Sequence, residues 1–477
     1  GVGPEAGIFT AIVAGFVISA LGGISVQIAG PTAAFATIVA GIVAKNGLDG
    51  LVIATILAGI FLILMGLCHF GTLIRFIPYT ITTGFTAGIA VTIVIGQLKD
   101  FFGVTYPDGV KPIETMEKLH AFVENCGTVN LSAVIVGVVS LAILIISPYI
   151  FKKIPGSLLA VVAGILMVKF LPLKASTIGD LYSISNALPG FHLPALSLAA
   201  VEDAIPNAFT IAVLAAIESL LSCVVADGMI NGKHRSDMEL VAQGAANIAS
   251  ALFGGIPATG AIARTAANIK NGGRTPIAGM VHSITLVLVL VVLMPYAGMI
   301  PMPTIAAILF VVAYNMCQWR PFTHLIQTAP KSDILVLLVT FFLTVVFDLV
   351  VAIEIGMLLT CLLFMKRMSD ETHVDSWTYV DDDSDAVNDH MQKLAKEIRV
   401  YEITGPLFFG AANAIEHIVV KDFTKCLVLR MRSVPALDST AMNALQNLVK
   451  YCEAKGITPI FSHVNEQPMH VMEKAGF

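Results

Sequence analysis

The stretch Gly254–Thr275 reads GGIPATGAIARTAANIKNGGRT, and the rest of the chain can be arranged around it. Its first part, Gly254–Ala263, is too rich in glycine and proline for a helix interior, so we expect it to be extended. The following residues, Arg264–Ile269, predict a short helix that begins at an arginine. The first N–H groups of a helix have no partner within it, so this helix start indicates a site for a negatively charged ligand.

A second stretch, Gly22–Ile38, reads GGISVQIAGPTAAFATI and repeats the same plan. Both stretches begin with Gly-Gly-Ile; six residues then lead to Pro31-Thr32-Ala33-Ala34 here, and seven lead to Arg264-Thr265-Ala266-Ala267 in the other. Ile24–Gly30 is expected to be extended, and Pro31–Ala44 to be a helix too short to cross a membrane. Two glycine-interrupted segments in corresponding halves are typical of a transporter's binding site. We therefore predict that two half-helix starts face each other and hold a small anion.

The composition is that of an integral membrane protein. Of the 477 residues, 56% are hydrophobic and 13% are charged, and the mean hydropathy is +0.84. A soluble domain would carry about twice that share of charge. The apolar runs are long and continuous, which favours helices that span a lipid bilayer. Nothing in the charge pattern indicates nucleic-acid binding. The sequence contains no catalytic triad, nucleotide-binding loop or metal-binding motif, so we expect neither an enzyme nor a bound cofactor.

The predicted spans form a transmembrane transport domain, residues 1–367, whose inverted halves are about 1–203 and 204–367. Polar loops are expected at Lys99–Asn130 and Pro172–Asp203. Basic residues are concentrated in alternate loops, which predicts a multi-pass protein of the cell membrane with its C-terminal domain in the cytoplasm. The expected spans are Ala6–Leu21, Leu51–Cys68, Tyr79–Leu98, Leu131–Ile150, Ser157–Leu171, Ala204–Ala226, Met238–Phe253, Pro276–Met294, Met302–Cys317, Ile334–Phe347 and Leu349–Met365.

Beyond the spans, residues 368–396 are expected to be a linker with an acidic run at Asp381–Asp385. Residues 397–477 then have the pattern of a soluble α/β domain. We expect strands at Arg399–Ile403, Cys426–Arg430 and Thr458–Ser462, and a helix at Thr440–Ala454. The chain begins without methionine and ends at Phe477 in what reads as a helix, so we expect both ends to be cut short.

Four motifs follow one another along the chain: GPTAA at Gly30–Ala34, AAIESLLS at Ala215–Ser222, TGAIARTAAN at Thr259–Asn268 and GGRTP at Gly272–Pro276. In this order they resemble the SulP family of anion transporters (sulfate-permease type). The run LDSTAMNAL at Leu437–Leu445 resembles a STAS domain, named for sulfate transporters and anti-sigma antagonists.

The resemblance covers essentially the whole chain. It implies an α-helical polytopic membrane protein with a 7+7 inverted-repeat transporter fold and a small cytoplasmic α/β STAS domain. In that family a core domain holds the substrate between the two half-helices and moves against a gate domain. The resemblance also implies a homodimer, and a first span upstream of Gly1 that would complete the site.

Arg264 is the main candidate for substrate binding. A guanidinium inside a membrane costs several kcal/mol unless it is paired or solvated, and it offers a planar fork to a carboxylate or oxyanion. A structural pair with Glu218 or with carbonyl groups of the first half is the alternative. The small residues at both helix starts would contribute backbone N–H groups, although they could merely permit tight packing. The predicted substrate-binding residues are Gly30, Pro31, Thr32, Ala33, Gly260, Ala261, Ala263, Arg264 and Thr265, with Gln27 and Asn268 as further candidates.

Glu218 lies inside a predicted span, with Ser219 and Ser222 beside it. A carboxyl in hydrocarbon can take up and release a proton near neutral pH, because desolvation disfavours its charged form. We therefore predict that these three residues couple transport to H+. Relatives with aspartate at this position resemble sodium-coupled transporters, so a Na+ site formed by Glu218, Ser222 and the backbone near Gly260 and Ala261 is the alternative.

These observations predict a secondary active importer of a small anion, coupled to protons and working by alternating access. Bicarbonate, sulfate and C4-dicarboxylates such as fumarate all fit the chemistry, with sulfate slightly disfavoured. The alternatives are a sodium-coupled bicarbonate symporter, an uncoupled anion exchanger or channel, and a membrane sensor that signals through the STAS domain. In that domain, Ser439 follows Asp438 where anti-sigma antagonists carry a phosphorylated serine. Ser439 is thus a candidate regulatory residue, either phosphorylated or in contact with a cytoplasmic protein partner or a second copy.

Overall fold

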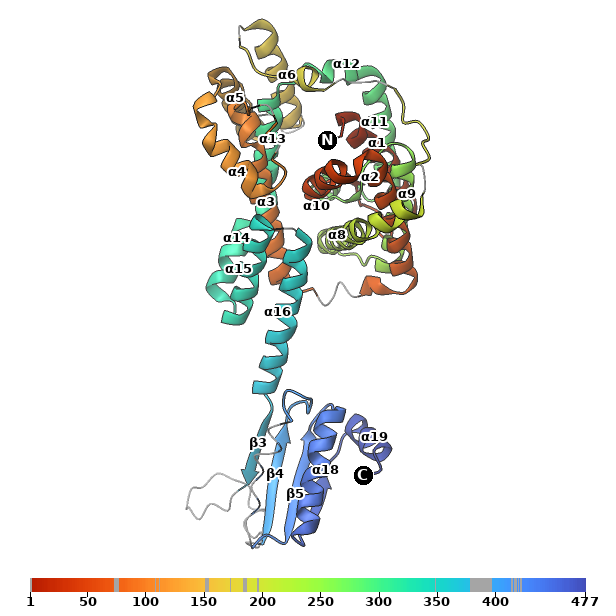
Figure 1. Cartoon of the computed structure of the whole chain (residues 1–477), viewed down its shortest axis with the longest axis vertical. Coiled ribbons are helices and arrows are strands. Elements are labelled where there is room, and N and C mark those ends of the chain that lie inside the picture. Colours follow the sequence, from red (N-terminus) through yellow and green to blue (C-terminus); the bar gives the residue numbers. More distant parts are fainter. Residues whose placement is uncertain are drawn as a thin grey trace. The chain divides into compact units, whose positions relative to one another are not determined.

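The computed structural model describes residues 2–72, 77–107, 109–110, 112–150, 154–171, 173–182, 187–194, 197–347, 349–377, 397–412, 415, 418, 420 and 423–477. The chain forms two compact units, Gly1–Met357 and Leu358–Phe477, and Figure 1 labels their helices and strands. The division falls within α16 (Leu349–Asp370), the helix in which the predicted transport domain also ends.

The first unit is built from helices. Seven helices in the described part of the chain are long and apolar enough to cross a membrane: Pro4–Leu21, Ile38–Leu67, Tyr79–Phe102, Leu131–Ile150, Leu198–Ile230, Pro276–Leu293 and Met302–Thr328. The elements are α1 (Pro4–Leu21), the 3₁₀ turn η1 (Ala33–Phe35), α2 (Ala36–Leu67), α3 (Tyr79–Phe102), α4 (Thr115–Glu124), α5 (Leu131–Ile150), α6 (Gly156–Phe170), α7 (Ile178–Leu181), α8 (Leu198–Ile230), α9 (Ser236–Leu252), α10 (Ile262–Lys270), α11 (Pro276–Leu288), a π-helical turn (Val289–Leu293), α12 (Met294–Ala297), α13 (Met302–Cys317), α14 (Trp319–Thr328), α15 (Lys331–Val346) and α16.

These helices pack as two bundles, which Figure 1 shows beside each other. In one, α2 packs on α8 and α9, α1 packs on α9 and α11, and α10 packs on α8. This group also holds two short strands, and we call it the strand-bearing bundle. In the other, α3 packs on α13 and α15, and α5 packs on α6 and α13. We call this group the α3 bundle.

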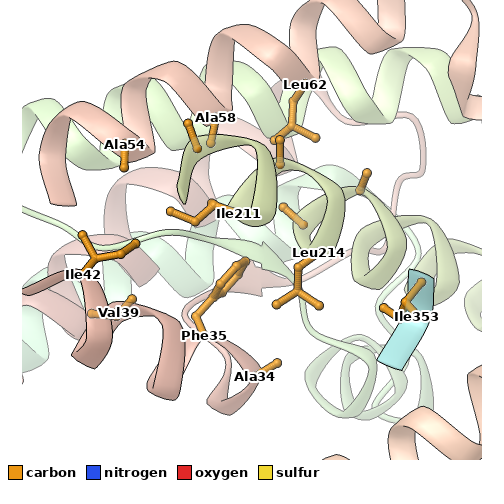
Figure 2. Packing of buried hydrophobic residues seen from close by; sticks show 14 of the residues in the cluster. Ala34, Phe35, Val39, Ile42, Ala54, Ala58, Leu62, Ile211, Leu214 and Ile353 are labelled. Atoms are coloured by element: carbon orange, nitrogen blue, oxygen red, sulfur yellow. The ribbon is translucent and has the colours of Figure 1, made fainter. Parts of the chain in front are cut away.

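Phe35 anchors the start of the first half-helix. Its side chain is 1% exposed and points toward Ile211 and Leu214 of α8 (Figure 2). Burying such a side chain contributes about 1.5–3 kcal/mol. Nearby, α2 and α9 approach closely at Gly59 and Gly244, where a Cβ atom on Gly59 would lie only 2.6 Å from the carbonyl oxygen of Gly244. The first half-helix is thus fixed to α8 by an aromatic anchor, beside a tight helix crossing.

The two Gly-Gly-Ile stretches are less extended than predicted. Only Ala29–Gly30 and Thr259–Gly260 pair as strands, and α10 begins at Ile262 rather than at Arg264. The reason is that Ala261 already accepts a helical hydrogen bond from Thr265 N at 2.8 Å, which places Arg264 inside the first turn.

The first short helix also differs from the prediction. It starts as η1, continues into α2, and runs through the expected loop to Leu67, with non-helical backbone only at Gly47. Two further helices, α4 and α14, lie in stretches that were not predicted to be helical. Both are short and amphipathic, so their many polar residues resemble a loop in the sequence.

The second unit contains a four-stranded sheet in the order β3-β4-β5-β6, in which β3 is antiparallel and the other pairs are parallel. Its elements are β3 (His373–Trp377), β4 (Ile398–Thr404), β5 (Cys426–Ser433), α18 (Ser439–Ala454), β6 (Thr458–Ser462) and α19 (Glu466–Lys474). The predicted strands and helix are found within three residues of their expected ends.

The predicted linker 368–396 was wrong in part, because β3 lies within it. This strand is a short polar edge strand, HVDSW, whose pairing partner β4 is what defines it. The acidic run Asp381–Asp385 lies outside the described residues. Phe477 follows the end of α19 and is not inside that helix.

Candidate functional site

Two short strands bring the two halves of the first unit together. β1 (Ala29–Gly30) pairs antiparallel with β2 (Thr259–Gly260), so that Ala29 lies opposite Gly260. The pairing continues through Ala261, whose N–H donates to the carbonyl of Ile28 at 3.0 Å. Each strand is followed directly by a helix start, η1 after β1 and α10 after β2. Two stretches that are far apart in the sequence therefore present their helix starts in one place.

Neither helix start has a side-chain cap on its first-turn N–H groups. At each start one alanine is exposed, Ala33 in η1 and Ala263 in α10, while Ala261 and Thr265 are buried. Uncapped N–H groups at the positive end of a helix attract negative charge. Small side chains allow a ligand to come close to such a backbone. This geometry is suited to a small anion.

Arg264 reaches from the second stretch to the first. Its Nη2 donates to the carbonyl oxygen of Pro31. A Cβ atom on Gly30 would lie only 2.6 Å from Nη1, so the guanidinium occupies the space that a side chain at Gly30 would take. The described residues give Arg264 this carbonyl partner and no ion pair with Glu218. A guanidinium has more N–H donors than one carbonyl can use, so others are available to an oxyanion.

Glu218 is a buried carboxyl in α8 that contacts the first stretch. Its side chain accepts a hydrogen bond at Oε2 from Thr32 Oγ1 at 3.0 Å, and Glu218 is 7% exposed. Thr32 directly precedes η1 and is its N-cap residue. The carboxyl is therefore linked through one hydroxyl to the start of the first half-helix.

Ser219 and Ser222 contact the second stretch instead. Ser219 Oγ shares a 2.8 Å hydrogen bond with Thr259 Oγ1 and accepts one of 2.9 Å from Gly260 N. Ser222 Oγ donates to Thr265 Oγ1 at 3.4 Å, and the same threonine oxygen accepts from Ile28 N at 3.1 Å. Both serines thus fasten α8 to β2 and α10, whereas Glu218 is bonded to Thr32.

A second buried carboxyl, Glu239 of α9, was missed by the sequence reasoning. It is fully buried and accepts hydrogen bonds from Gly23 N at 2.8 Å, Gln27 Nε2 at 2.7 Å and Gln243 Nε2 at 3.2 Å. It therefore fixes the segment before β1. Asn268 donates to Val26 O at 2.9 Å in the same segment, so Gln27 and Asn268 are both engaged within the protein. The sequence did offer one signal for Glu239, because a carboxyl within a predicted span is unusual and indicates a structural or functional role.

A cavity of about 820 Å³ lies between the two bundles. The strand-bearing bundle contributes Ala33 at the first helix start, together with residues of α2 and α8. The α3 bundle contributes residues of α3, α13 and α15, and residues of α4 and α16 complete the lining. Of the predicted site residues, only Ala33 lines it. Its polar side chains are Thr92, Gln97, Glu114, Thr115, Lys118, Asn207, Thr210 and Thr344. The cavity thus connects one helix start with α4.

Ser439 is exposed in the first turn of α18. The preceding Asp438 caps this helix: its Oδ1 accepts from Ala441 N at 2.8 Å, and its Oδ2 accepts from Phe409 N at 2.8 Å. A phosphate on Ser439 would meet free N–H groups, but also the negative charge of Asp438.

Comparisons with known proteins agree with this architecture. Residues 1–340 match the Sulfate permease family and residues 392–477 match the STAS domain. The chain is 39% identical to the putative sulfate transporter YvdB of Bacillus subtilis, over 100% of this chain and 89% of the relative. It is 31% identical to the bicarbonate transporter BicA of Picosynechococcus sp., over 94% of this chain and 82% of the relative.

Solved structures share the fold. The transmembrane domain of a cyanobacterial bicarbonate transporter BicA aligns with a TM-score of 0.65 and 29% identity, over 73% of this chain and 90% of that one. The murine anion transporter Slc26a9, in an inward-facing state, aligns with a TM-score of 0.86 and 17% identity, over 100% of this chain and 83% of that one. With its paired half-helix starts and its C-terminal α/β unit, this chain belongs to the sulfate permease family and carries a STAS domain.

Proposed function

We propose that this protein is a secondary active transporter that imports a small oxyanion together with a proton. Bicarbonate, sulfate and a C4-dicarboxylate are the candidate substrates. The observation that carries the proposal is the crossing of the two halves at β1 and β2: Arg264 of the second half lies at the first helix start, and Glu218 is hydrogen-bonded to Thr32 at the same start. The names of the sulfate and bicarbonate transporters among its relatives support anion transport.

In this mechanism the anion binds between the helix starts. Uncapped N–H groups of η1 and α10 and the spare donors of Arg264 bind its oxygens. The anion competes with the Pro31 carbonyl for the guanidinium. Movement of the strand-bearing bundle against the α3 bundle then exposes the site to either side of the membrane.

Glu218 supplies the coupling in this proposal. A hydroxyl can donate to a carboxylate and can equally accept from a protonated carboxyl, so the Thr32 contact survives protonation with its direction reversed. Protonation removes one negative charge beside the incoming anion without breaking that contact. The hydroxyls of Ser219 and Ser222 are bonded to Thr259 and Thr265, which supports a proton over a sodium ion held by all three residues.

The test is uptake of labelled bicarbonate, sulfate and fumarate by proteoliposomes under imposed proton or sodium gradients. Glu218→Gln should abolish accumulation driven by the proton gradient, because glutamine keeps a hydrogen bond to Thr32 but cannot carry the proton. Glu202→Gln, on an exposed residue of the same helix, is the matched control and should behave as the wild type.

Arg264→Ala should abolish saturable uptake of every anion, whereas Arg320→Ala, an exposed arginine of α14, should not. Proton-driven accumulation that persists in Glu218→Gln would refute the coupling role. Accumulation driven only by sodium would assign Glu218 to a cation site. Linear, non-saturating anion currents would indicate a channel, and anion binding without flux would indicate a sensor.

A further inference from the structure

The cavity between the two bundles contains a lysine that the predicted site does not include. We propose that Lys118 of α4 is an anion-recruiting residue, which binds the substrate oxyanion in this cavity before it reaches the helix starts. The proposal rests on the proposed function, since it concerns the entry of the transported anion. It assigns a substrate contact to α4, a helix in what the sequence predicted to be a polar loop.

The carboxylates beside Lys118 accept hydrogen bonds from backbone N–H groups. Glu117 Oε2 accepts hydrogen bonds from Ile113 N at 3.0 Å and from Glu114 N at 3.3 Å. The Glu114 side chain in turn accepts from the N–H of Glu117, which completes a capping box at the start of α4. Among the described residues, no carboxylate forms an ion pair with Lys118. Its ammonium group is therefore available to a ligand.

Lys118 is also partly withdrawn from water. Its side chain is half-buried in the cavity wall. Burial lowers the pKa of Lys118, while the negative charge of Glu117 raises it. A cation that has lost part of its hydration without gaining an ion pair is stabilised by any anion that enters the cavity.

Glu114 places a carboxylate in the cavity lining, and the remaining polar groups there suit an oxyanion. Gln97 and Thr92 of α3 lie on one wall, and Asn207 and Thr210 of α8 on the other. Amide and hydroxyl groups donate hydrogen bonds to oxygen atoms without a fixed charge, so Lys118 supplies the attraction and these residues replace water. At about 820 Å³ the cavity is far larger than a small anion, so it suits an entry vestibule in which Lys118 attracts the anion, with the tight site elsewhere.

The first experiment compares Lys118→Arg, Lys118→Gln and Lys118→Glu for initial rates of sulfate and bicarbonate uptake at several ionic strengths. Removing the charge should raise KM by about 3-fold and reversing it by about 10-fold, with Vmax nearly unchanged, because a recruiting charge acts on encounter. Lys118→Arg should restore the wild-type KM. The salt dependence of KM should weaken in Lys118→Gln.

Lys174→Glu is the matched control, because Lys174 is exposed and is not among the residues that line the cavity. Its KM should not change. A Lys118→Glu protein that transports with the wild-type KM would overturn the proposal. An equal rise in KM for Lys174→Glu would also overturn it, since the effect would then come from general surface charge.

A second experiment does not depend on transport. The wild-type protein is acetylated with a water-soluble succinimidyl ester in increasing sulfate or bicarbonate at constant ionic strength, and Lys118 and Lys174 are followed by peptide mass spectrometry. The anion should slow acetylation of Lys118 and leave Lys174 unaffected. Such protection in a protein without uptake would sustain the recruiting site while refuting the proposed transport. Saturable uptake without protection would refute the recruiting site alone.

Discussion

Gly30→Ala tests whether the Arg264 guanidinium is held where the geometry places it. The new Cβ would lie 2.6 Å from Nη1 of Arg264, whereas ordinary contacts begin at 3.4 Å, so the guanidinium must move by roughly 1 Å. Overpacking of this kind costs about 1–3 kcal/mol. If the shift also breaks the bond to the Pro31 carbonyl, a charge-assisted hydrogen bond of about 1.5–3 kcal/mol is lost.

The assay is a double-mutant cycle on the midpoint of thermal unfolding in detergent. We expect Gly30→Ala to lower the unfolding midpoint by about 2–4 °C for each kcal/mol of lost stability, as in other large domains. In an Arg264→Ala background the part of this cost that comes from the contact with the guanidinium should vanish, because the next neighbours, Cα and Cβ of Ala11, lie at an acceptable 3.5 Å. Gly30 also has φ of +155°, and the strain of an alanine there is the same in both backgrounds, so it cancels from the coupling energy.

The same variants report on anion binding. A ligand that binds the folded protein raises the midpoint in proportion to its affinity, so added sulfate or bicarbonate should stabilise the wild type more than Gly30→Ala. Gly228→Ala is the control, since a Cβ atom there meets no atom within 4 Å. Equal costs of Gly30→Ala with and without Arg264 would refute the contact and, with it, the position assigned to the guanidinium.

Three further predictions concern stability. Gly59→Ala should destabilise the transmembrane unit by about 1–3 kcal/mol, because its Cβ would meet the Gly244 carbonyl oxygen at 2.6 Å. Thermal unfolding measures the effect against Gly228→Ala, and an unchanged midpoint would contradict the tight crossing of α2 and α9. Glu239→Gln should lower the free energy of unfolding by about 1–3 kcal/mol. It replaces a carboxylate that accepts hydrogen bonds from Gly23, Gln27 and Gln243 by an amide with one acceptor oxygen. An unchanged stability would show that the segment before β1 is held by other contacts. Asp438→Ala should destabilise the STAS domain by about 1–2 kcal/mol, because it removes the hydrogen bonds from Ala441 N and Phe409 N, and Asp438→Asn should have an intermediate effect. Chemical denaturation followed by circular dichroism measures this loss of stability. A wild-type midpoint for Asp438→Ala would exclude the cap.

The sequence pattern predicted the membrane fold and that the two glycine-rich stretches come together, because both depend on local signals. Long apolar runs must become helices in a bilayer, and glycine-rich interruptions in two corresponding places predict paired half-helices. It could not predict that Ser219 and Ser222 bond Thr259 and Thr265, while Glu218 bonds Thr32. The three residues are neighbours on α8, and their partners depend on how a helix rotates against two distant stretches, which no local pattern contains.

Glu239 and Lys118 were missed for different reasons. Glu239 lies at the start of a stretch that was predicted to span the membrane, and a single carboxyl at the end of an apolar run did not change that prediction. Lys118 lies in a polar stretch where charged residues are usually solvated, and only the packing of α4 on α3 and α15 turns it toward a cavity. The burial of a charged residue can be predicted from sequence only where the packing around it can also be predicted.

In the proposed mechanism, the crossed contacts let the proton and the anion act on one structural element. Thr32 and Pro31 are consecutive residues at the start of η1, and they bond Glu218 and Arg264 respectively. Loss of charge on Glu218 alters the electrostatic environment of Thr32, and an anion that draws the guanidinium away frees the Pro31 carbonyl. Both events therefore change the same turn of backbone, which Phe35 fixes to α8. Coupling in this arrangement needs no long pathway, because the two ligands bias the position of a single helix start relative to the α3 bundle.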